Sequence, residues 1–405
     1  MDQAEMASYP VDASSVQYVV GIDIGSQTCS LCALKSDKSQ VIKPTEFVNA
    51  AAGFALLQEQ LEHLGVPASQ ILIGLEATSR YGENLYRFLE GCGYQLCLLH
   101  PRQTHQFAQQ RGLRAKTDPL DASTIARVLL SGEARPGYVP TELIATYREL
   151  VRLHSQLGDD IARYKNEIHA LLSVLFPEFT QVFLDPCRPT ALAALKRYPS
   201  AQAMAAAGVE TVAALLHELA PRHYGLKTAQ QLVGLAQHTV SSGIAASARS
   251  STLKVLCDQL AHTQTNLAQL EQEIDNLLDA DQGAKGVQSV PEFGRKMVAV
   301  LRAELGDVTR FQRADQVVAY AGLDIAVRQS GKWRGEAKLS KRGSGRLRRI
   351  LYMTAVRCIR RKRLRLWAIL PSPLDPRDET ARCVGCRHAQ DAPGGLSVVA
   401  DRGGV

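Results

Sequence analysis

The 405-residue sequence has no apolar run near the ~20 residues that a transmembrane helix needs, so we expect no membrane partner. Its first residues, MDQAEMASYPVDASSV, lack the basic start and apolar stretch of a secretory signal. We interpret residues 1–17 as a flexible tail and predict a cytoplasmic protein.

The sequence also lacks the cysteine density of a disulfide framework, because its nine cysteines are spread over a long chain. Two pairs, Cys29/Cys32 and Cys383/Cys386, have the C-x-x-C spacing of zinc ligands. The first pair lies in a predicted strand, where residues three apart point to opposite faces. A shared zinc ion is therefore not expected.

Positive charge is unevenly distributed along the chain. Between Arg310 and Arg365 there are 17 Lys or Arg residues and three acids, which leaves about −7 of the net charge of +7 for the rest. A solvated surface usually mixes both signs, whereas a concentrated basic segment is typical of a polyanion-binding protein. Nucleic acid is the favoured partner.

The first hundred residues alternate between strand and helix patterns. Strands are predicted at 18–35 (two, joined by a glycine-containing turn), 41–50, 70–77 and 94–100, and helices at 53–65 and 82–93. This alternation predicts an α/β fold, with helices covering both faces of a sheet.

After Pro140 the pattern becomes helical, with two seams of alternating three- and four-residue steps. The first is Leu150, Leu153, Leu157, Ile161, Tyr164, Ile168, Leu171 and Leu175, and the second is Leu253, Leu256, Leu260, Thr263, Leu267, Leu270, Ile274 and Leu277. Such seams predict coiled-coil packing, either between two chains or between the two helices of one chain. An Ala-rich helical insert, 186–245, separates them.

Four carboxylates occupy predicted strand ends or helix starts: Asp23 in GIDIG, Glu76 in ILIGLEAT, and Asp118 and Asp121 in TDPLDAS. Asp118 could simply cap a helix with Pro119 at its first position, and Asp121 could favour the helix N-terminus. Asp23 is harder to explain, since a charge within an apolar strand is costly unless it is paired or binds a cation. Carboxylates are the ligands of hard cations such as Mg²⁺, which serve phosphodiester chemistry in pairs.

The order of these acids, with the contexts GIDIG, LEATSRYGENL and KTDPLDA, resembles the DEDD transposases of one insertion-sequence family over residues 18–362. The resemblance implies a ribonuclease-H-like (Holliday-junction-resolvase-like) N-terminal domain whose four acids bind two Mg²⁺ ions. It also implies central coiled-coil helices and a mainly helical C-terminal domain. The expected domains are a catalytic domain at 18–130, a helical linker and coiled coil at 131–282, and a transposase domain at 283–362.

The basic region contains VPEFGRKMVAVLRAELG, which is similar to half of a helix-hairpin-helix. The family usually has Pro-Gly-hydrophobic-Gly where this chain has Pro291-Glu292-Phe293-Gly294, and losing the first glycine weakens the case for close phosphate approach. Clustered arginines suit bidentate phosphate contacts. The predicted nucleic-acid-binding residues are Arg114, Lys116, Lys332, Arg334, Lys338, Lys341, Arg342, Arg346, Arg348 and Arg349.

The resemblance continues through YAGLDIAVRQSGKWRG and LSKRGSGRLRR. It implies that Ser330 attacks DNA and forms a covalent phosphoserine. Ser340 and Ser344 also lie among cations and remain competitors. Tyr352 is a weaker candidate, because no Arg-His-Arg pattern of a tyrosine recombinase accompanies it.

The resemblance further implies a structured noncoding guide RNA that pairs with donor and target DNA, and dimers that assemble into tetramers. VGIDIGSQT also resembles the first phosphate loop of actin-like ATPases and sugar kinases, but their later Asp-x-Gly-Gly and Gly-Gly-Gly segments are missing. A metal-dependent junction nuclease and an inactive nucleic-acid-binding remnant remain alternatives.

The tail, 363–405, is rich in Pro and Gly and departs from the family pattern. Codons for the family's Met-Arg-Lys-Met-Leu, read one base earlier, encode His-Ala-Gln-Asp-Ala, which is His388 to Ala392. We hypothesise a frameshift near residue 362 that leaves the Cys383/Cys386 pair without function and could inactivate the enzyme.

Overall fold

The computed structural model describes residues 15–76, 80–110, 118–290, 293–326, 329–330, 333–334 and 338–361, and only the backbone of 118–120, 326, 329–330, 333–334 and 358–361. Arg114, Lys116, Lys332 and the tail 363–405 lie outside the described residues. The chain divides into two compact units. The sheet unit comprises Met1–Arg152 and Leu305–Tyr320, and the helical unit comprises Leu153–Glu304 and Ala321–Val405.

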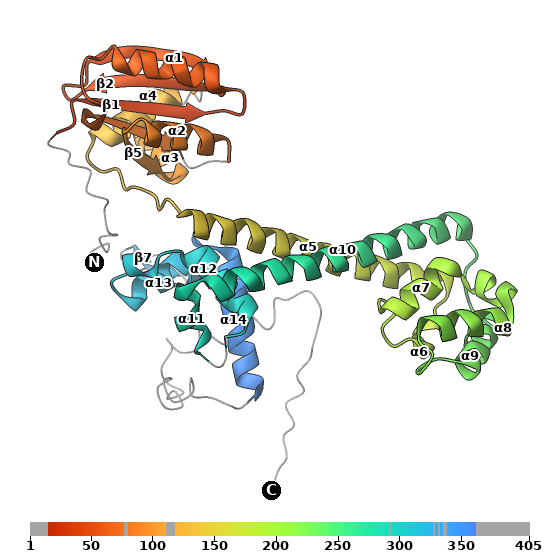
Figure 1. Cartoon of the computed structure of the whole chain (residues 1–405). Helices are drawn as coiled ribbons and strands as arrows, with labels where there is room; N and C mark the ends of the chain where they lie inside the picture. Colours follow the sequence, from red (N-terminus) through yellow and green to blue (C-terminus); the bar gives the residue numbers. More distant parts are fainter. Residues whose placement is uncertain are drawn as a thin grey trace, which may run out of the picture. The chain divides into compact units, whose positions relative to one another are not determined.

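A five-stranded sheet in the order β3-β2-β1-β4-β5 forms the centre of the sheet unit (Figure 1). The strands are β1 (Tyr18–Ile24), β2 (Thr28–Lys35), β3 (Gln40–Val48), β4 (Ile71–Glu76) and β5 (Gln95–Leu99). β2 is antiparallel to β1 and β3, whereas β1, β4 and β5 are parallel. This order and direction are those of ribonuclease-H-like folds, so the predicted α/β fold is confirmed.

Helices cover both faces of the sheet, as the alternating pattern predicted. On one face α1 (Ala51–Glu62) and α2 (Glu83–Gly91) pack on a core that includes Ile22, Ile73 and Leu75. On the other face α4 (Asp118–Leu130) packs on Val19, Leu72 and Leu99. The remaining elements of this part are η1 (Ala68–Gln70), η2 (Arg80–Gly82) and α3 (Pro101–Gln110), a helix the sequence pattern did not reveal.

Cys29 and Cys32 confirm the alternation of side chains along β2. Cys29 belongs to the core on the α1 and α2 face, and Cys32 to the core on the α4 face. Burial raises the pKa of the Cys29 thiol to about 11. The thiol is therefore protonated at neutral pH, which is unfavourable for a metal ligand.

α4 approaches the sheet unusually closely because two glycines face it. Gly21 of β1 is paired with Gly74 of β4 in the parallel register. A Cβ atom at Gly21 would overlap the backbone carbonyl of Ala122 and lie 2.5 Å from the backbone nitrogen of Ala126. Both strands thus provide the space that the helix occupies.

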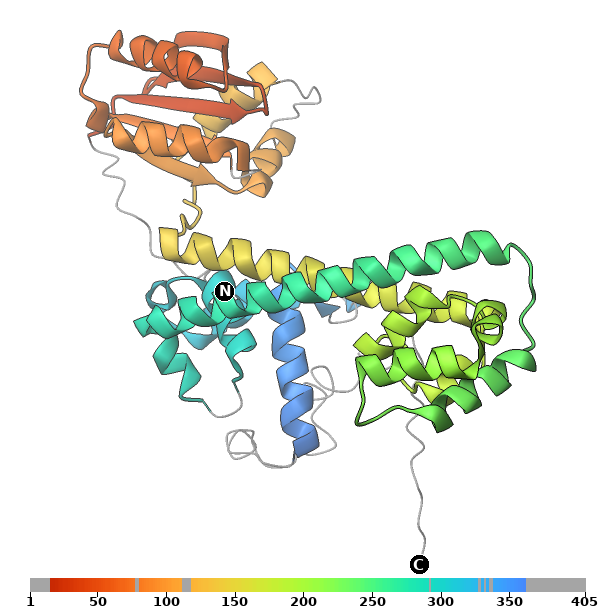
Figure 2. The same cartoon turned by 45° about the vertical axis from the view of Figure 1, so that its right-hand side comes forward.

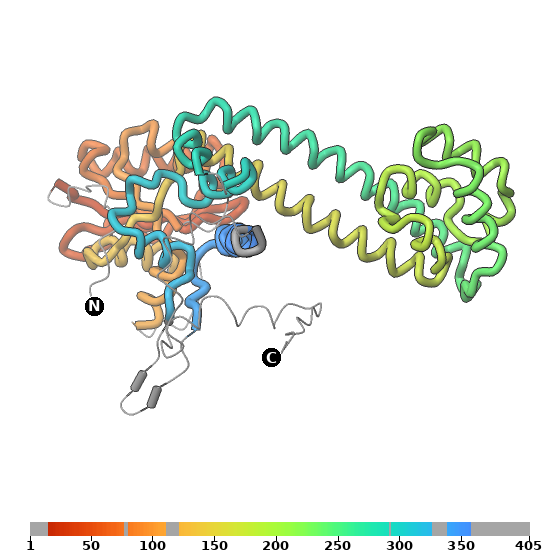
Figure 3. Tube along the Cα trace, turned by 90° about the horizontal axis from the view of Figure 1, so that it is seen from below, coloured from red at the N-terminus to blue at the C-terminus, as the bar shows by residue number. Residues whose placement is uncertain are grey.

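Two long helices, α5 (Glu142–Leu175) and α10 (Ala246–Ala280), run side by side (Figures 2 and 3). They are antiparallel: His154 of α5 contacts Glu271 of α10 with 2.9 Å between Nε2 and Oε1, while Leu172 shares a core with Leu256. The predicted seam of α10 is mostly buried. These contacts are made within one chain, and coiled-coil pairing between chains remains a prediction.

The α5 seam differs from the prediction in its first half. Val151 and His154 are buried there, whereas Leu153 is 45% exposed and Leu150 is half-buried. Further along, Ile168 is buried as expected. The buried stripe of α5 therefore keeps a seven-residue spacing, but it begins at Val151 and His154 instead of the predicted Leu150 and Leu153.

Three helices lie in the predicted insert, α7 (Pro189–Arg197), α8 (Ala201–Leu219) and α9 (Leu226–Gln237), and the short α6 (Phe179–Val182) precedes it. Their core is continuous with the ends of α5 and α10 where the two long helices join the insert (Figure 3). Burial raises the pKa of Cys257 to about 12 and that of Cys187 to about 11. Both thiols serve packing.

The C-terminal region is mainly helical, as expected, but also contains short strands. Its elements are α11 (Gln282–Gln288), α12 (Arg295–Leu305), η3 (Val308–Arg310), α13 (Ala314–Ala321), β6 (Ile325–Ala326), β7 (Gln329–Ser330), β8 (Trp333–Arg334), β9 (Lys338–Leu339) and α14 (Gly345–Arg361). Across the residues that the structure describes, no helix has both the length and the apolarity to cross a membrane.

Candidate functional site

Asp23 and Glu76 lie at the carboxyl ends of neighbouring parallel strands. The register pairs Gly21 with Gly74 and Ile22 with Leu75, so the next positions in line are Asp23 and Glu76. Since side chains alternate along a strand, both carboxylates share the face of the two glycines, which α4 covers.

The first turn of α4 supplies the other two predicted acids. Ala122, next to Asp121, lies directly over Gly21 of the strand that carries Asp23. The helix begins at Asp118, so this residue opens the helix as predicted and its side chain lies outside the described part. The glycine contact thus brings the acidic end of α4 to the edge where the strand acids lie.

Glu76 is held by a threonine that sequence reasoning did not single out. Thr104 of α3 is buried and donates a hydrogen bond from Oγ1 to Glu76 Oε2 at 2.8 Å. The same hydroxyl lies 2.9 Å from the backbone oxygen of Pro101. No sequence pattern indicated this contact, because α3 itself was not predicted.

The chemistry of these side chains fits a hard divalent cation, since every donor is a carboxylate oxygen. Asp23, Glu76 and Asp121 are partly exposed, so a cation and a phosphate could reach them. Among the side chains that the structure describes, no three His, Cys, Asp or Glu residues are grouped closely enough to hold a metal ion. The side chain of Asp118 lies outside the described part of the chain.

Ser330 belongs to the helical unit and lies near the tip of a β-hairpin. β6 pairs with β9 (Ile325 with Leu339), and β7 pairs with β8 (Ser330 with Trp333). The backbone thus places Ser330 in the strand pair β7–β8, where two residues of the chain separate it from its partner Trp333. Its side chain is not described, so its role as nucleophile remains a prediction.

Ser340, a competing nucleophile, is tied to the base of this hairpin. Its Oγ is within hydrogen-bonding distance of Asp324 Oδ1, and its backbone N–H donates to the Asp324 carbonyl at 2.9 Å. Lys341 follows in the left-handed region, with φ of 53°, and its N–H donates to Gly322 O at 3.1 Å. These contacts explain Ser340 as a structural residue.

Ser344 also has a structural partner. It precedes α14, and its Oγ accepts a hydrogen bond from Leu347 N at 3.2 Å. An N-terminal cap of this kind satisfies a backbone donor that the helix leaves unpaired. The hydroxyls of Ser340 and Ser344 are thus both engaged within the fold.

The predicted basic surface divides into exposed and internal cations. Arg348 donates from Nη1 to the carbonyls of Ala321 at 3.0 Å and Gly343 at 2.7 Å, so it stabilises the turn before α14. Arg349 donates to Asp159 at 3.1 Å, with both side chains largely exposed. The exposed members also include Lys338, Lys341, Arg342 and Arg346.

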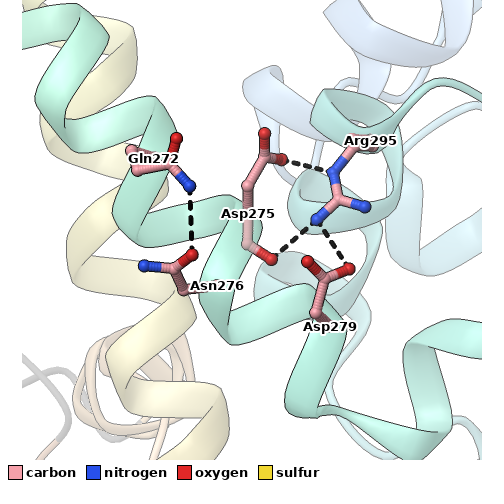
Figure 4. A network of polar contacts seen from close by, with 5 residues as sticks. All are labelled: Gln272, Asp275, Asn276, Asp279 and Arg295. Carbon is pink, nitrogen blue, oxygen red and sulfur yellow. Dashed lines mark hydrogen bonds and ion pairs between the residues drawn. The ribbon is translucent and has the colours of Figure 1, made fainter.

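Arg295, the first residue of α12, is neutralised by α10 (Figure 4). Its guanidinium donates to Asp275 Oδ1 at 2.5 Å, to Asp275 O at 2.7 Å and to Asp279 Oδ1 at 2.9 Å. These hydrogen bonds raise the pKa of Arg295. The residue therefore fixes the start of α12 after the hairpin-like turn, where a phosphate contact could have been expected.

Family comparisons cover both predicted functional regions. A family model of the IS110 DEDD type, described as a transposase, matches residues 20–177. A second, described as the transposase IS116/IS110/IS902 family, matches residues 284–368. Together they span the acids and the serine hairpin.

Several curated proteins are similar to this chain. It is 28% identical to the IS110 43.6 kDa protein of Streptomyces coelicolor over 60% of this chain and 61% of that protein. It is 24% identical to the IS116 44.8 kDa protein of Streptomyces clavuligerus over 83% of each. A pilin gene-inverting protein of Moraxella bovis is 22% identical over 83% of this chain and 81% of its own length.

Among solved structures, Thermus thermophilus RuvC in complex with a Holliday junction substrate matches 30% of this chain and 99% of its own length. The identity is 16% and the TM-score is 0.22. The order and directions of the five strands establish the fold.

Proposed function

Because the chain belongs to the IS110/IS116 family of insertion-sequence transposases, we propose that it cuts and rejoins DNA strands of a mobile element in a Mg²⁺-dependent reaction. The observation that carries this proposal is the alignment of Asp23 with Glu76 at two parallel strand ends, beneath the acidic start of α4. Similarity to pilin gene-inverting proteins favours rejoining over cutting alone, since an inversion requires both.

Asp23, Glu76, Asp118 and Asp121 are the proposed ligands of two Mg²⁺ ions. When bound, such ions would lower the charge repulsion at the phosphate and activate the attacking oxygen. Thr104 orients Glu76 through its hydrogen bond. We expect the close contact of α4 with Gly21 to set the distance between the helix acids and the strand acids.

Ser330 is the proposed nucleophile. Its Oγ would form a bond to phosphorus while one deoxyribose oxygen leaves, and the proton lost by the serine balances the proton gained by the leaving hydroxyl. Attack by a deoxyribose hydroxyl on the phosphoserine would reverse these bonds and rejoin a strand. Ser340 is less suited, because its hydroxyl is bound to Asp324.

The basic residues of the C-terminal region are the proposed contacts to nucleic acid. We further propose that an element-encoded guide RNA pairs with donor and target DNA, and that dimers associate into tetramers. The concentrated positive charge between Arg310 and Arg365 supports a polyanion partner without distinguishing RNA from DNA. We also propose that the reaction takes place in the cytoplasm.

The test uses labelled DNA spanning the joined element ends, Mg²⁺ and the noncoding RNA, analysed on a denaturing gel. Asp23→Ala should abolish cutting, whereas Asp37→Ala, which removes an exposed carboxylate in the same unit, should cut normally. Ser330→Ala should remove a DNA–protein adduct that Ser340→Ala retains.

Each other result identifies a different alternative. Free cleaved DNA without an adduct would indicate a metal-dependent junction nuclease. If cutting requires replacement of residues 363–405 by the alternative reading frame, the chain is an inactive remnant. Recombination by Ser330→Ala at the wild-type rate would show that another residue is the nucleophile.

A further inference from the structure

A cleft of about 720 Å³ lies at the carboxyl ends of the parallel strands, next to Glu76. Ile24 of β1, Leu75 of β4 and Leu98 of β5 form its floor. These three side chains belong to the α1 and α2 face of the sheet, opposite the glycines that face α4. Glu76 therefore connects the acidic edge to this cleft, in the position where open α/β sheets bind ligands.

The first turns of α5 form the opposite wall and are fixed to the sheet unit. Arg80 of η2 pairs with Glu149 of α5, with 2.5 Å between Nη2 and Oε2. The preceding segment is also held, because Gly137 N–H donates to Leu98 O at 2.6 Å. The cleft is thus a feature of one compact unit.

Four arginines and three glutamates supply the charged lining, and among them Arg152 has an unmet hydrogen-bonding requirement. Its Nε is buried and has no partner among the described residues. By contrast, Arg80 is paired with Glu149 and Arg87 with Glu90, at 2.8 Å. A buried donor without a partner is costly, and a phosphate oxygen would satisfy it with a charge-assisted hydrogen bond.

The remaining wall suits a nucleoside better than a small inorganic anion. Tyr86, Val139 and Pro140 join the apolar floor, so the cleft has a charged side that includes Arg152 and an apolar, partly aromatic side. Sugars and bases pack on such surfaces while arginines hold the backbone phosphate. The volume also lies within the range of small-ligand pockets, roughly 300–1,000 Å³.

We propose that this cleft binds one nucleotide of the DNA strand whose phosphodiester is cut at the acids, with its phosphate on Arg152 and its nucleoside against Tyr86. The proposal rests on the proposed function for the position of the cut. It adds Arg152 as a nucleotide-positioning residue and a second nucleic-acid contact remote in sequence from the C-terminal basic segment.

Photocrosslinking tests the proposal without requiring catalysis. The full-length Asp23→Asn protein, which should not cut, is mixed with DNA carrying 5-iododeoxyuridine at successive positions around the element junction. We expect an adduct at Tyr86 from one or two adjacent positions. Arg152→Gln should reduce its yield at limiting DNA about tenfold, as expected for a lost charged hydrogen bond.

Arg163→Gln is the matched control, because Arg163 lies on the same helix, is paired with Asp160 and does not line the cleft. Its adduct yield should equal that of the parent. Arg152→Lys keeps the charge and should restore part of the yield, and unchanged thermal unfolding shows that either variant is folded. If Arg152→Gln unfolds at a lower temperature than the parent, Arg152→Lys provides the test. Complete loss of the Tyr86 adduct in folded Arg152→Lys would overturn the phosphate role of Arg152.

Adducts that form only outside the cleft, or a Tyr86 adduct unchanged in folded Arg152→Gln, would also overturn the proposal. Failure of the proposed function is separable, since it is measured by cutting with the unsubstituted protein. A Tyr86 adduct without cutting would support the cleft and refute the nuclease chemistry. Cutting without the Tyr86 adduct would support the nuclease chemistry and refute the proposed role of the cleft.

Discussion

Replacing Gly21 by alanine should damage the acidic site while leaving every carboxylate in place. The added Cβ would lie 2.5 Å from Ala126 N, whereas ordinary contact starts at 3.4 Å, so α4 must move by about 0.9 Å or more. A catalytic constellation tolerates roughly 0.5 Å, and a 1 Å displacement can cost about 100-fold in rate. Overpacking against backbone should also cost about 3 kcal/mol of unfolding free energy.

Two other glycines provide graded controls. A Cβ at Gly74 would meet the side-chain atoms Leu129 Cδ1 at 2.6 Å and Ile125 Cγ2 at 2.9 Å, which can move more easily than backbone. Gly74→Ala should therefore cost less, about 1–2 kcal/mol. Gly234 of α9 has open space around it, so Gly234→Ala should be neutral or stabilising by up to about 1 kcal/mol.

Thermal unfolding and Mg²⁺-dependent cutting of labelled DNA measure the two effects separately. We expect Gly21→Ala to melt roughly 6–12 °C lower and, at a temperature where it is folded, to cut at least 100-fold more slowly. If Gly21→Ala cuts at the wild-type rate, the close approach of α4 does not position the acids. A larger loss in Gly74→Ala than in Gly21→Ala would refute the distinction between backbone and side-chain contacts.

Three further perturbations test other parts of the fold. Asp281→Asn should destabilise the protein by about 3 kcal/mol in denaturant unfolding, because it leaves the guanidinium of Arg302 buried beside a neutral partner; an effect below 1 kcal/mol would contradict this. Partial burial raises the pKa of Glu178, but hydrogen bonds from Thr239 and a backbone N–H outweigh it and lower the pKa overall. The stabilising contribution of ionised Glu178 is thus present above the unfolded-state pKa and lost as the pH falls through the folded-state pKa. Glu178→Gln should therefore make the free energy of unfolding less sensitive to acid. Identical pH profiles of stability for the two proteins would contradict this. Ser340→Ala should lower stability by about 1 kcal/mol and retain the DNA–protein adduct on a denaturing gel, and loss of the adduct in a folded variant would make Ser340 the nucleophile.

The fold of the sheet unit could be predicted largely from local patterns. Strands such as β4 combine apolar residues with clear ends, and helices such as α1 stop near a glycine, Gly65, with φ of 71°. The opposite orientation of Cys29 and Cys32 followed from alternation alone. α3 was missed because it begins immediately after the strand β5, at Pro101, and has a mostly polar sequence.

The seam of α5 shows where a one-dimensional pattern fails. Leucines at 150 and 153 suggested a stripe that the structure replaces with Val151 and His154. The apolar pattern did not predict that His154 is buried. Its partner there is Glu271 of α10, a residue far away in the sequence. A polar residue inside a packed helix pair can be recognised only when its partner is known.

The acids of the candidate site could be predicted from the sequence, whereas the residues around them could not. Asp23 and Glu76 were conspicuous because carboxylates interrupt apolar strands, and this conflict with burial is visible in the sequence. Arg148 and Arg152 were not conspicuous, since arginines one turn apart on a helix normally face solvent. Only the folding of α5 against the strand ends turns them toward a cleft beside Glu76. The acids therefore predict the proposed reaction class from sequence, whereas the proposed path of the nucleic acid depends on tertiary contacts that no local pattern encodes.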